Sequence, residues 1–380
     1  MNPGTLGIPA LQPRSNGVRE RATGGASMPH GTFLLADIGG YTTFLSDVGI
    51  EHAKEITGHL LNGMFEVDPE VWKLGDVEGD CLFLYADEPQ SAEDVFAYLR
   101  RLYETFRESL EEIVTGSTCR CGACDRSGDL TLKFVVHGGD FAVEKIAGQQ
   151  QLIGRDVVVA HRLLKNHVPV REYALLTQPL REVAERSDFE TIAGREEYDD
   201  IGPVEYVYVD LAGVRADFHE RRAVFLSEAD ADLVATVEVA APPEFVWGVI
   251  QDMGHSPEIF PTLVETESLA GRFDEMGSVH TCLHGDGMQL VHYRVAHDEV
   301  GRRATDRLTG VPVVGRMLQT WEAKASGDGT RFAFYFTLQP ETEITDGQRS
   351  VVLEAVRSHA ERDVEGVRSF CEAKYKARST

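Results

Sequence analysis

The sequence is poor in basic residues, and this deficit determines the charge of its surface. Of its 380 residues, 37 are Lys or Arg and 62 are Asp or Glu, so the formal net charge is −25. Nucleic acids and anionic membranes are not attracted to an acidic surface, so we expect neither as a general partner. A nucleotide held locally through a divalent cation remains compatible with this charge.

Long hydrophobic runs are also missing. No apolar stretch approaches the roughly 18 residues that a membrane-spanning helix needs. The N-terminal segment MNPGTLGIPALQPRSNGVRERATGGAS lacks the apolar centre of a signal peptide and is rich in Gly, Pro and Arg. We therefore expect a disordered tail over residues 1–28, and translation could start at either Met1 or Met28.

Cysteine is scarce, with six residues in the whole chain, which is too few for a disulfide scaffold and favours a reducing cytoplasm. Three of the six cluster in STCRCGACDRSGDL as Cys119, Cys121 and Cys124. Zn²⁺ prefers sulfur ligands in a tetrahedron, and this spacing lets three thiolates converge on one ion. The pattern predicts a zinc site, with His137 as the nearest candidate for a fourth ligand. The alternative is a surface loop of free thiols, which would be open to oxidation.

The length and the hydrophobic pattern predict two domains of α+β class. The first part of the chain interleaves short apolar strands with amphipathic helices, such as the helix expected over 91–114. The second part has a run of strand candidates between 262 and 338, followed by one long helix over 346–375. The expected units are a domain over residues 29–212, a charged linker over 213–230 and a second domain over 231–377.

Two aspartates stand where a predicted strand meets a glycine turn: Asp37 in ADIGG and Asp80 in EGDC. A charge at the end of a buried strand is costly unless it has a partner. Two carboxylates on adjacent strand ends can share one or two divalent ions, as in enzymes of phosphoryl transfer. The alternative is that both are ordinary turn residues that cap a helix or a hairpin.

Four segments occur in the order and at roughly the spacing of class III nucleotide cyclase domains: FLLADIGGYTTFL, VEGDCLFLYA, LKFVVHGGDF and LIGRDVVVAHRLL. The resemblance covers about residues 30–210. It implies a ferredoxin-like sandwich that forms a head-to-tail homodimer. It also implies that Asp37 and Asp80 bind Mg²⁺ or Mn²⁺, that Gln151 contacts the nucleotide base, and that Arg162 stabilises the transition state.

Two positions depart from the cyclase pattern. Asp76 stands where the family has its base-recognising lysine, and Val158 stands where it has its ribose-orienting asparagine. A carboxylate places negative charge where the nucleotide should bind, and a valine side chain has no polar atom to offer. The resemblance is therefore to a divergent cyclase-like family, and it implies nucleotide binding without efficient cyclisation, or no nucleotide binding.

The second domain opens with VEVAAPPEFVWGVIQDMGHSPEIFPTLVETESL and ends in the long helix. It resembles the START-like (SRPBCC) helix-grip superfamily, which includes polyketide cyclases and lipid-transfer proteins. The resemblance covers about residues 231–376 and implies a sheet curled around the last helix, with an apolar cavity for a hydrophobic small molecule. Four residues on the central strands could face either this cavity or the solvent: His280, His284, His292 and Tyr293.

Together these features favour a cytoplasmic sensing or regulatory protein, in which a cyclase-like domain with little or no activity accompanies a ligand-binding domain. One alternative is an active purine nucleotide cyclase that uses Asp37, Asp80 and Arg162. Another is a polyketide cyclase-type enzyme or a lipid carrier acting through the second domain. Asp76 and Val158 count against the first alternative, and the lack of an evident polar catalytic set counts against the enzymatic form of the second.

The cysteine cluster gives a direct prediction. We expect the thiolates of Cys119, Cys121 and Cys124 to hold about one Zn²⁺ per chain after purification without added metal, at sulfur–metal distances of about 2.3 Å. Elemental analysis measures this zinc, and replacing all three cysteines with serine should remove it. Freshly reduced protein that contains no zinc would leave only the free-thiol loop.

Overall fold

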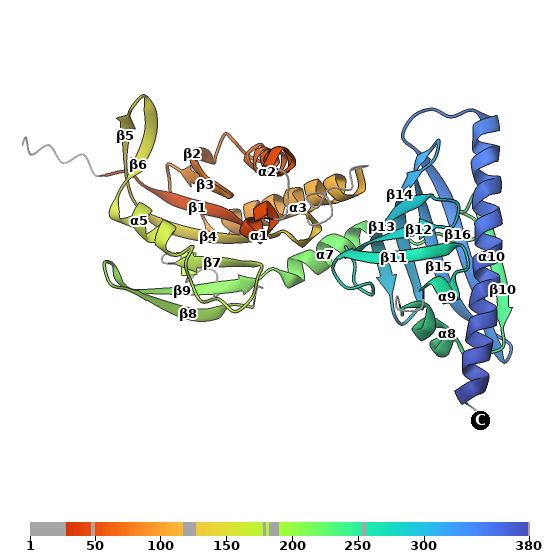
Figure 1. Ribbon diagram of the computed structural model, residues 1–380. Helices are drawn as coiled ribbons and strands as arrows, with labels where there is room; N and C mark the ends of the chain where they lie inside the picture. The colour runs from red at the N-terminus through yellow and green to blue at the C-terminus, as the bar shows by residue number, and fades with distance from the viewer. Residues whose placement is uncertain are drawn as a thin grey trace, which may run out of the picture.

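The computed structural model describes residues 28–46, 50–116, 127–177, 180–181, 190–252 and 256–378. It consists of two bodies, each built around a seven-stranded sheet (Figure 1). The strands of the first sheet lie between His30 and Asp210, and those of the second between Leu233 and Pro340. This architecture confirms the predicted α+β fold class.

The first sheet has the strand order β2-β3-β1-β4-β7-β9-β8. Its neighbouring strands are antiparallel except β4 and β7, which pair in parallel. The strands are β1 (His30–Gly39), β2 (Lys73–Glu78), β3 (Cys81–Ala86), β4 (Thr131–Asp140), β7 (Tyr173–Thr177), β8 (Ile192–Tyr198) and β9 (Gly202–Asp210).

Helices cover both faces of the first sheet because apolar side chains alternate along its strands. On β1, Leu34 and Ala36 belong to the core beneath α2 and α3, whereas Phe33 and Leu35 belong to the opposite core, which α5 covers. By the same alternation Asp37 faces the α5 side. The remaining elements of this body are α1 (Tyr41–Ser46), α2 (Ile50–Phe65), α3 (Ala92–Gly116), η1 (Ser127–Asp129), α5 (Arg155–Arg162) and a separate hairpin of β5 (Ala142–Ile146) and β6 (Gln149–Ile153).

The second sheet is antiparallel throughout, in the order β10-β16-β15-β14-β13-β12-β11. The long helix α10 (Asp346–Arg378) packs against β10 and β16, which is the arrangement expected of a helix-grip fold. The strands are β10 (Leu233–Val239), β11 (Leu263–Ala270), β12 (Val279–His284), β13 (Gln289–Asp298), β14 (Arg303–Val311), β15 (Gly315–Ser326) and β16 (Gly329–Pro340); two short helices, α8 (Pro243–Ile250) and α9 (Ser256–Ile259), precede β11. Within the described part of the chain, no helix combines the length and the apolar character needed to cross a membrane.

The charged segment between the two sheets is not simply a linker. It contains α7 (Ala212–Arg222), whose Phe218 and His219 are buried. Arg222 on this helix lies 3.5 Å from Glu111 of α3, which also binds Arg307 of β14. The basic residues that made this segment resemble a linker therefore pair with α3 of the first body, and Arg307 of the second body binds the same Glu111.

The two bodies also meet through apolar contacts on the outer face of the second sheet. Val114 of α3 belongs to the same buried cluster as Val279 of β12 and Tyr293 of β13. Gly128 of η1 lies so near Ala270 of β11 that a Cβ at Gly128 would stand 2.6 Å from the Cβ of Ala270. Strands β12 and β13 of the second sheet thus contact the first domain through the side chains on their outer face.

Candidate functional site

Asp37 and Asp80 lie at neighbouring strand ends in the first domain. Asp37 pairs with Cys81 in the register of β1 and β3, and the backbone oxygen of Asp80 accepts a hydrogen bond from Ile38 at 3.2 Å. Burial, and next the negative charge of Asp37, raise the pKa of Asp80. The two carboxylates are thus close enough for their charges to repel.

Asp37 has a cationic partner on the adjacent strand. Lys133 stands opposite Asp37 in the register of β1 and β4, and its Nζ lies 2.9 Å from Oδ2 of Asp37. Burial lowers the pKa of Lys133, but the hydrogen bond and the charge of Asp37 more than reverse this, so the pKa is raised. An ammonium group therefore supplies the positive charge that the sequence pattern assigned to a divalent cation, and the divalent site itself stays a prediction.

The other cyclase-like positions lie elsewhere in the first domain. Arg162, the last residue of α5, is half-exposed and donates to Asp200 at 2.8 Å, while Gln151 lies on β6. Asp76 is exposed on β2, and Val158 is 48% exposed on α5. Among the described residues, Arg162 and Gln151 form no hydrogen bond or ion pair with either carboxylate. In the cyclase pattern the base-recognising and ribose-orienting groups come from the partner subunit, and these assignments stay predictions.

Cys119, Cys121 and Cys124 lie outside the described residues, so their zinc site also stays a prediction. His137, the nearest candidate for a fourth ligand, is buried on β4. Its Nδ1 shares a hydrogen bond with Thr177, and its Nε2 lies 3.8 Å from Asp156. The imidazole therefore already has polar neighbours inside the first domain.

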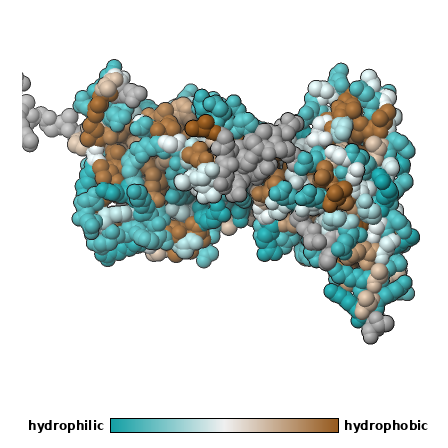
Figure 2. Space-filling model, in the orientation of Figure 1, coloured by the Kyte–Doolittle hydropathy of each residue, from teal (hydrophilic) through white to brown (hydrophobic). Residues whose placement is uncertain are grey.

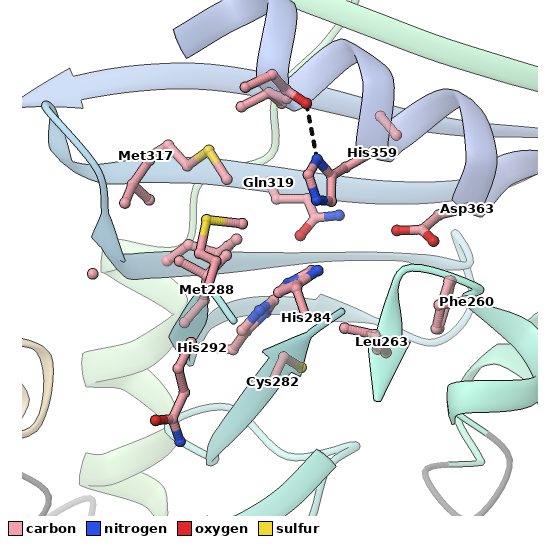
Figure 3. A pocket seen from close by; sticks show the side chains of 18 of the residues that line it. Phe260, Leu263, Cys282, His284, Met288, His292, Met317, Gln319, His359 and Asp363 are labelled. Atoms are coloured by element: carbon pink, nitrogen blue, oxygen red, sulfur yellow. Dashed lines mark hydrogen bonds between the residues drawn. The ribbon is translucent and has the colours of Figure 1, made fainter. Parts of the chain in front are cut away.

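The second domain encloses a cavity of about 580 Å³ between the inner face of its sheet and α10. Figure 3 shows His284 and His292 entering it from the sheet, and His359 and Asp363 facing them from α10. Much of the remaining lining is apolar, including Phe260, Leu263, Met288, Leu308, Met317, Trp321, Phe334, Phe336 and Val356.

The structure decides which way the four candidate residues of the second domain face. His280, His284 and His292 line the cavity, whereas Tyr293 packs in the cluster on the outer face. All four are buried, so the solvent-facing alternative is wrong for each of them. Their strands are covered on both faces, which a sequence with alternating polar residues does not reveal.

Three potential metal ligands meet on the cavity wall. His280 pairs with His292 across β12 and β13, and their rings stack with centroids 4.6 Å apart. Cys282 is two residues further along β12 and therefore on the same face as His280. One ligand atom from each of His280, Cys282 and His292 lies within 4.8 Å of the others, and all three residues are buried.

A buried ion pair stands behind this group. Arg294 is fully buried, its Nε donates to Oδ1 of Asp306, and Oδ2 of Asp306 lies 3.5 Å from Nδ1 of His292. The guanidinium also lies over the rings of Phe273 and Trp321, at 4.8 and 5.3 Å from the ring centroids. Such contacts compensate a charge that burial would otherwise disfavour.

The surroundings shift the pKa values of the two stacked histidines in opposite directions. Burial, and next the charge of His292, lower the pKa of His280 well below its ordinary value. Burial also opposes a charge on His292, but Cys282 and Asp306 outweigh it and raise the pKa of His292 to about 10. Burial raises the pKa of Asp306, yet Arg294 and the histidines hold it well below its usual range. The wall of the cavity is therefore strongly polarised.

Cys282, His359 and Asp363 also line the cavity and were not identified from the sequence, although two patterns could have indicated them. The stretch HTCLH places His280, Cys282 and His284 on one strand face, because side chains alternate with period two. His359 and Asp363 are four residues apart on the last helix, so they lie on one helix face. Gln319, which also lines the cavity, has no comparable signal.

Comparison with known families supports the two-part organisation. Residues 58–173 match the family described as "Protein of unknown function (DUF2652)". Residues 230–369 match the family described as "Polyketide cyclase / dehydrase and lipid transport". The second match confirms the resemblance predicted for the second domain.

Individual relatives each cover only part of the chain. An uncharacterized protein of Mycobacterium tuberculosis is 32% identical over 141 residues, which is 37% of this chain and 66% of that protein. Similar solved structures include the adenylyl cyclase CyaB from P. aeruginosa, at 15% identity and a TM-score of 0.37 over 47% of this chain and 93% of that one. They also include the Zhui aromatase/cyclase from Streptomyces, at 23% identity and a TM-score of 0.33 over 38% of this chain and 96% of that one.

The carboxylate pair predicts that millimolar Mn²⁺ or Mg²⁺ raises the melting temperature of the wild-type protein, since a ligand bound only by the folded state stabilises it. Asp37→Ala and Asp80→Ala should each abolish the gain. Lys133→Met should lower the melting temperature without metal and enlarge the gain with Mn²⁺, because it removes the competing ammonium. Lys145→Met, on the exposed β5, is the matched control. An equal gain in the double aspartate variant would show that the ion binds elsewhere.

Proposed function

We propose that the second domain binds a hydrophobic small molecule and that its occupancy regulates the cyclase-like domain. The observation that carries the proposal is the cavity of about 580 Å³ between the sheet and α10. Ligand pockets typically measure about 300–1,000 Å³ and combine apolar walls with a few polar groups. The match to a family of polyketide cyclases and lipid-transport proteins supports the same class of ligand.

The lining favours a ligand with aromatic rings and polar substituents. Phe260, Trp321 and Phe334 pack against one another as tilted and edge-to-face pairs, which suits a flat ring system. Gln319 from the sheet and Asp363 from α10 offer hydrogen-bonding groups on opposite walls (Figure 3). Polar groups at fixed positions would orient such a ring system within the cavity.

Regulation requires a path from the cavity to the first domain, and β12 and β13 supply one. Their inner face carries His280 and His292, and their outer face carries Val279 and Tyr293 in contact with the cluster that includes Val114. The pair of Arg307 with Glu111 joins the next strand to α3. A ligand that shifts these strands would therefore move the surface on which α3 rests.

In this proposal the cyclase-like domain has weak catalytic activity or no activity. It binds a nucleotide together with Mg²⁺ or Mn²⁺ at Asp37 and Asp80. It would act as a homodimer. The β5–β6 hairpin exposes Val143, Ile146 and Ile153 at 45%, 52% and 48%, and Figure 2 shows hydrophobic side chains at this end of the molecule. Exposed apolar patches often mark protein interfaces, so the hairpin is the surface we assign to dimerisation.

One observation favours a second candidate function, a polyketide cyclase-type enzyme. The cavity wall gathers His280, Cys282 and His292 beside a buried Arg–Asp pair, and groups with perturbed pKa values are common in catalytic sites. A lipid carrier has no need of such groups. The geometry by itself defines no reaction, so binding remains the primary proposal.

Ligand binding predicts a fluorescence response to a neutral apolar probe such as N-phenyl-1-naphthylamine. The probe should gain emission in the wild type and quench Trp321, which lines the cavity. Val356→Trp places a ring in the cavity and should weaken binding at least tenfold, about 1.4 kcal/mol. Arg357→Trp, on the exposed side of α10, should bind like the wild type. Equal weakening in both variants, or no probe binding at all, would contradict the cavity assignment.

The departures from the cyclase pattern predict no cyclic AMP or cyclic GMP above background from ATP or GTP with Mn²⁺. Correct alignment of reacting groups can contribute roughly 7–11 kcal/mol to catalysis, and Asp76 and Val158 cannot supply it. The double change Asp76→Lys with Val158→Asn should raise activity or nucleotide affinity. Robust wild-type turnover that is lost in Asp37→Ala would favour an active purine nucleotide cyclase with Arg162 as its transition-state residue.

A further inference from the structure

We propose that His280, Cys282 and His292 bind a zinc ion on the wall of the cavity in the second domain. This site is separate from the cysteine cluster of the first domain. One ligand atom from each of the three side chains lies within 4.8 Å of the other two. Tetrahedral zinc, with bonds of about 2.0–2.1 Å to nitrogen and 2.3 Å to sulfur, places its ligand atoms roughly 3.3–3.8 Å apart. Small side-chain rotations would close this difference.

The three side chains project from two paired strands of the sheet. His280 and Cys282 come from one strand, and His292 comes from the adjacent strand directly opposite His280. Backbone hydrogen bonds of the sheet fix the spacing of all three before any ion arrives. Sites built on strands hold their ligands more accurately than sites built on loops, so binding needs little ordering of the chain.

Unpartnered nitrogen atoms are the second observation. Nδ1 of His280 and both ring nitrogens of His292 are buried and have no hydrogen-bond partner. The residues are only 3% and 7% exposed. A buried polar atom without a partner costs roughly 1–3 kcal/mol, so native proteins rarely leave several together unless they serve a function. A metal ion would satisfy one nitrogen of each ring.

The surroundings of His292 match the outer shell of a metal site. Asp306 lies 3.5 Å from Nδ1 of His292, which leaves Nε2 as the nitrogen for the ion. Arg294 in turn donates to Oδ1, the other oxygen of the Asp306 carboxylate. A carboxylate behind a ligating histidine fixes the orientation of the ring and raises its basicity, and such partners accompany most histidine ligands.

The donor set selects the metal. One thiolate and two imidazoles suit Zn²⁺, whereas Mg²⁺ and Ca²⁺ prefer oxygen ligands. Zinc binds thiolate and neutral imidazole, so its binding displaces the protons that these side chains carry without the metal. With three protein ligands, the zinc would keep its fourth position for a molecule in the cavity, since all three residues line it.

The local charges indicate what occupies this fourth position. The zinc ion, the Cys282 thiolate, the Asp306 carboxylate and the Arg294 guanidinium together leave one uncompensated positive charge in a buried site. A hydroxide ion, or a carboxylate, phenolate or enolate group of the bound molecule, would neutralise it. This last step rests on the proposed function, because it assumes a ligand in the cavity, whereas the zinc site itself does not.

The test uses full-length protein in which Cys119, Cys121 and Cys124 are serine, so that the cavity site is measured alone. We expect about one zinc per chain by elemental analysis and native mass spectrometry. Cys282→Ser in this background should lose it, while Cys371→Ser, which alters another buried thiol of the same domain, should retain it. A folded Cys282→Ser variant that retains zinc overturns the assignment. So does another transition metal in place of zinc in the protein that carries only the three serine substitutions.

A second measurement does not depend on how well the Cys282→Ser variant folds. Co²⁺ is added to zinc-free Cys371→Ser protein, again with serine at positions 119, 121 and 124. A thiolate-to-cobalt charge-transfer band should grow until one equivalent of Co²⁺ is bound, and added Zn²⁺ should remove the band. The absence of this band in folded protein overturns the site.

The fourth position is tested with two probes, neutral N-phenyl-1-naphthylamine and a carboxylate derivative of it. Zinc should tighten binding of the carboxylate at least tenfold and leave the neutral probe unchanged. A carboxylate that binds equally with and without zinc overturns the anion assignment alone. Zinc binding without binding of either probe overturns the proposed function and leaves the metal site standing.

Discussion

The pairing of β12 with β13 in one fixed register is the constraint on which the second domain depends. Because side chains alternate across a strand, this register places His280 opposite His292 on the inner face and Val279 opposite Tyr293 on the outer face. A slip of one residue would exchange the two sets and leave imidazoles against the first domain. The cavity chemistry and the contact between the domains are therefore fixed by the same hydrogen bonds.

Charge compensation is the corresponding theme of the first domain. Asp37 stands at the end of a buried strand, where an isolated carboxylate would be costly. Lys133 pairs with it from the next strand, and its ammonium offsets a small part of the rise in the pKa of Asp80 that burial and the charge of Asp37 cause. The protein itself thus supplies a positive charge at this strand end.

The fold was largely predictable because local pattern and tertiary structure agree. The alternating strands and the amphipathic helices of both domains form where the hydrophobic periods indicated, including the long final helix. The segment around α7 was not predictable, because its arginines resemble those of a solvated linker. Only the folded chain brings Arg222 close to Glu111, which is more than a hundred residues away in sequence.

The class of fold, the acidic surface and the presence of histidines on the central strands follow from the order of the amino acids, because they depend on local pattern and composition. The same order locates Asp37 and Asp80 at strand ends, because glycine turns mark such positions locally. The face that each strand residue occupies, and the partners that it meets, follow instead from strand pairing in the folded chain. Lys133 joins Asp37, and His292 joins His280 and Cys282, through strand pairing between segments that local periodicity cannot relate to one another.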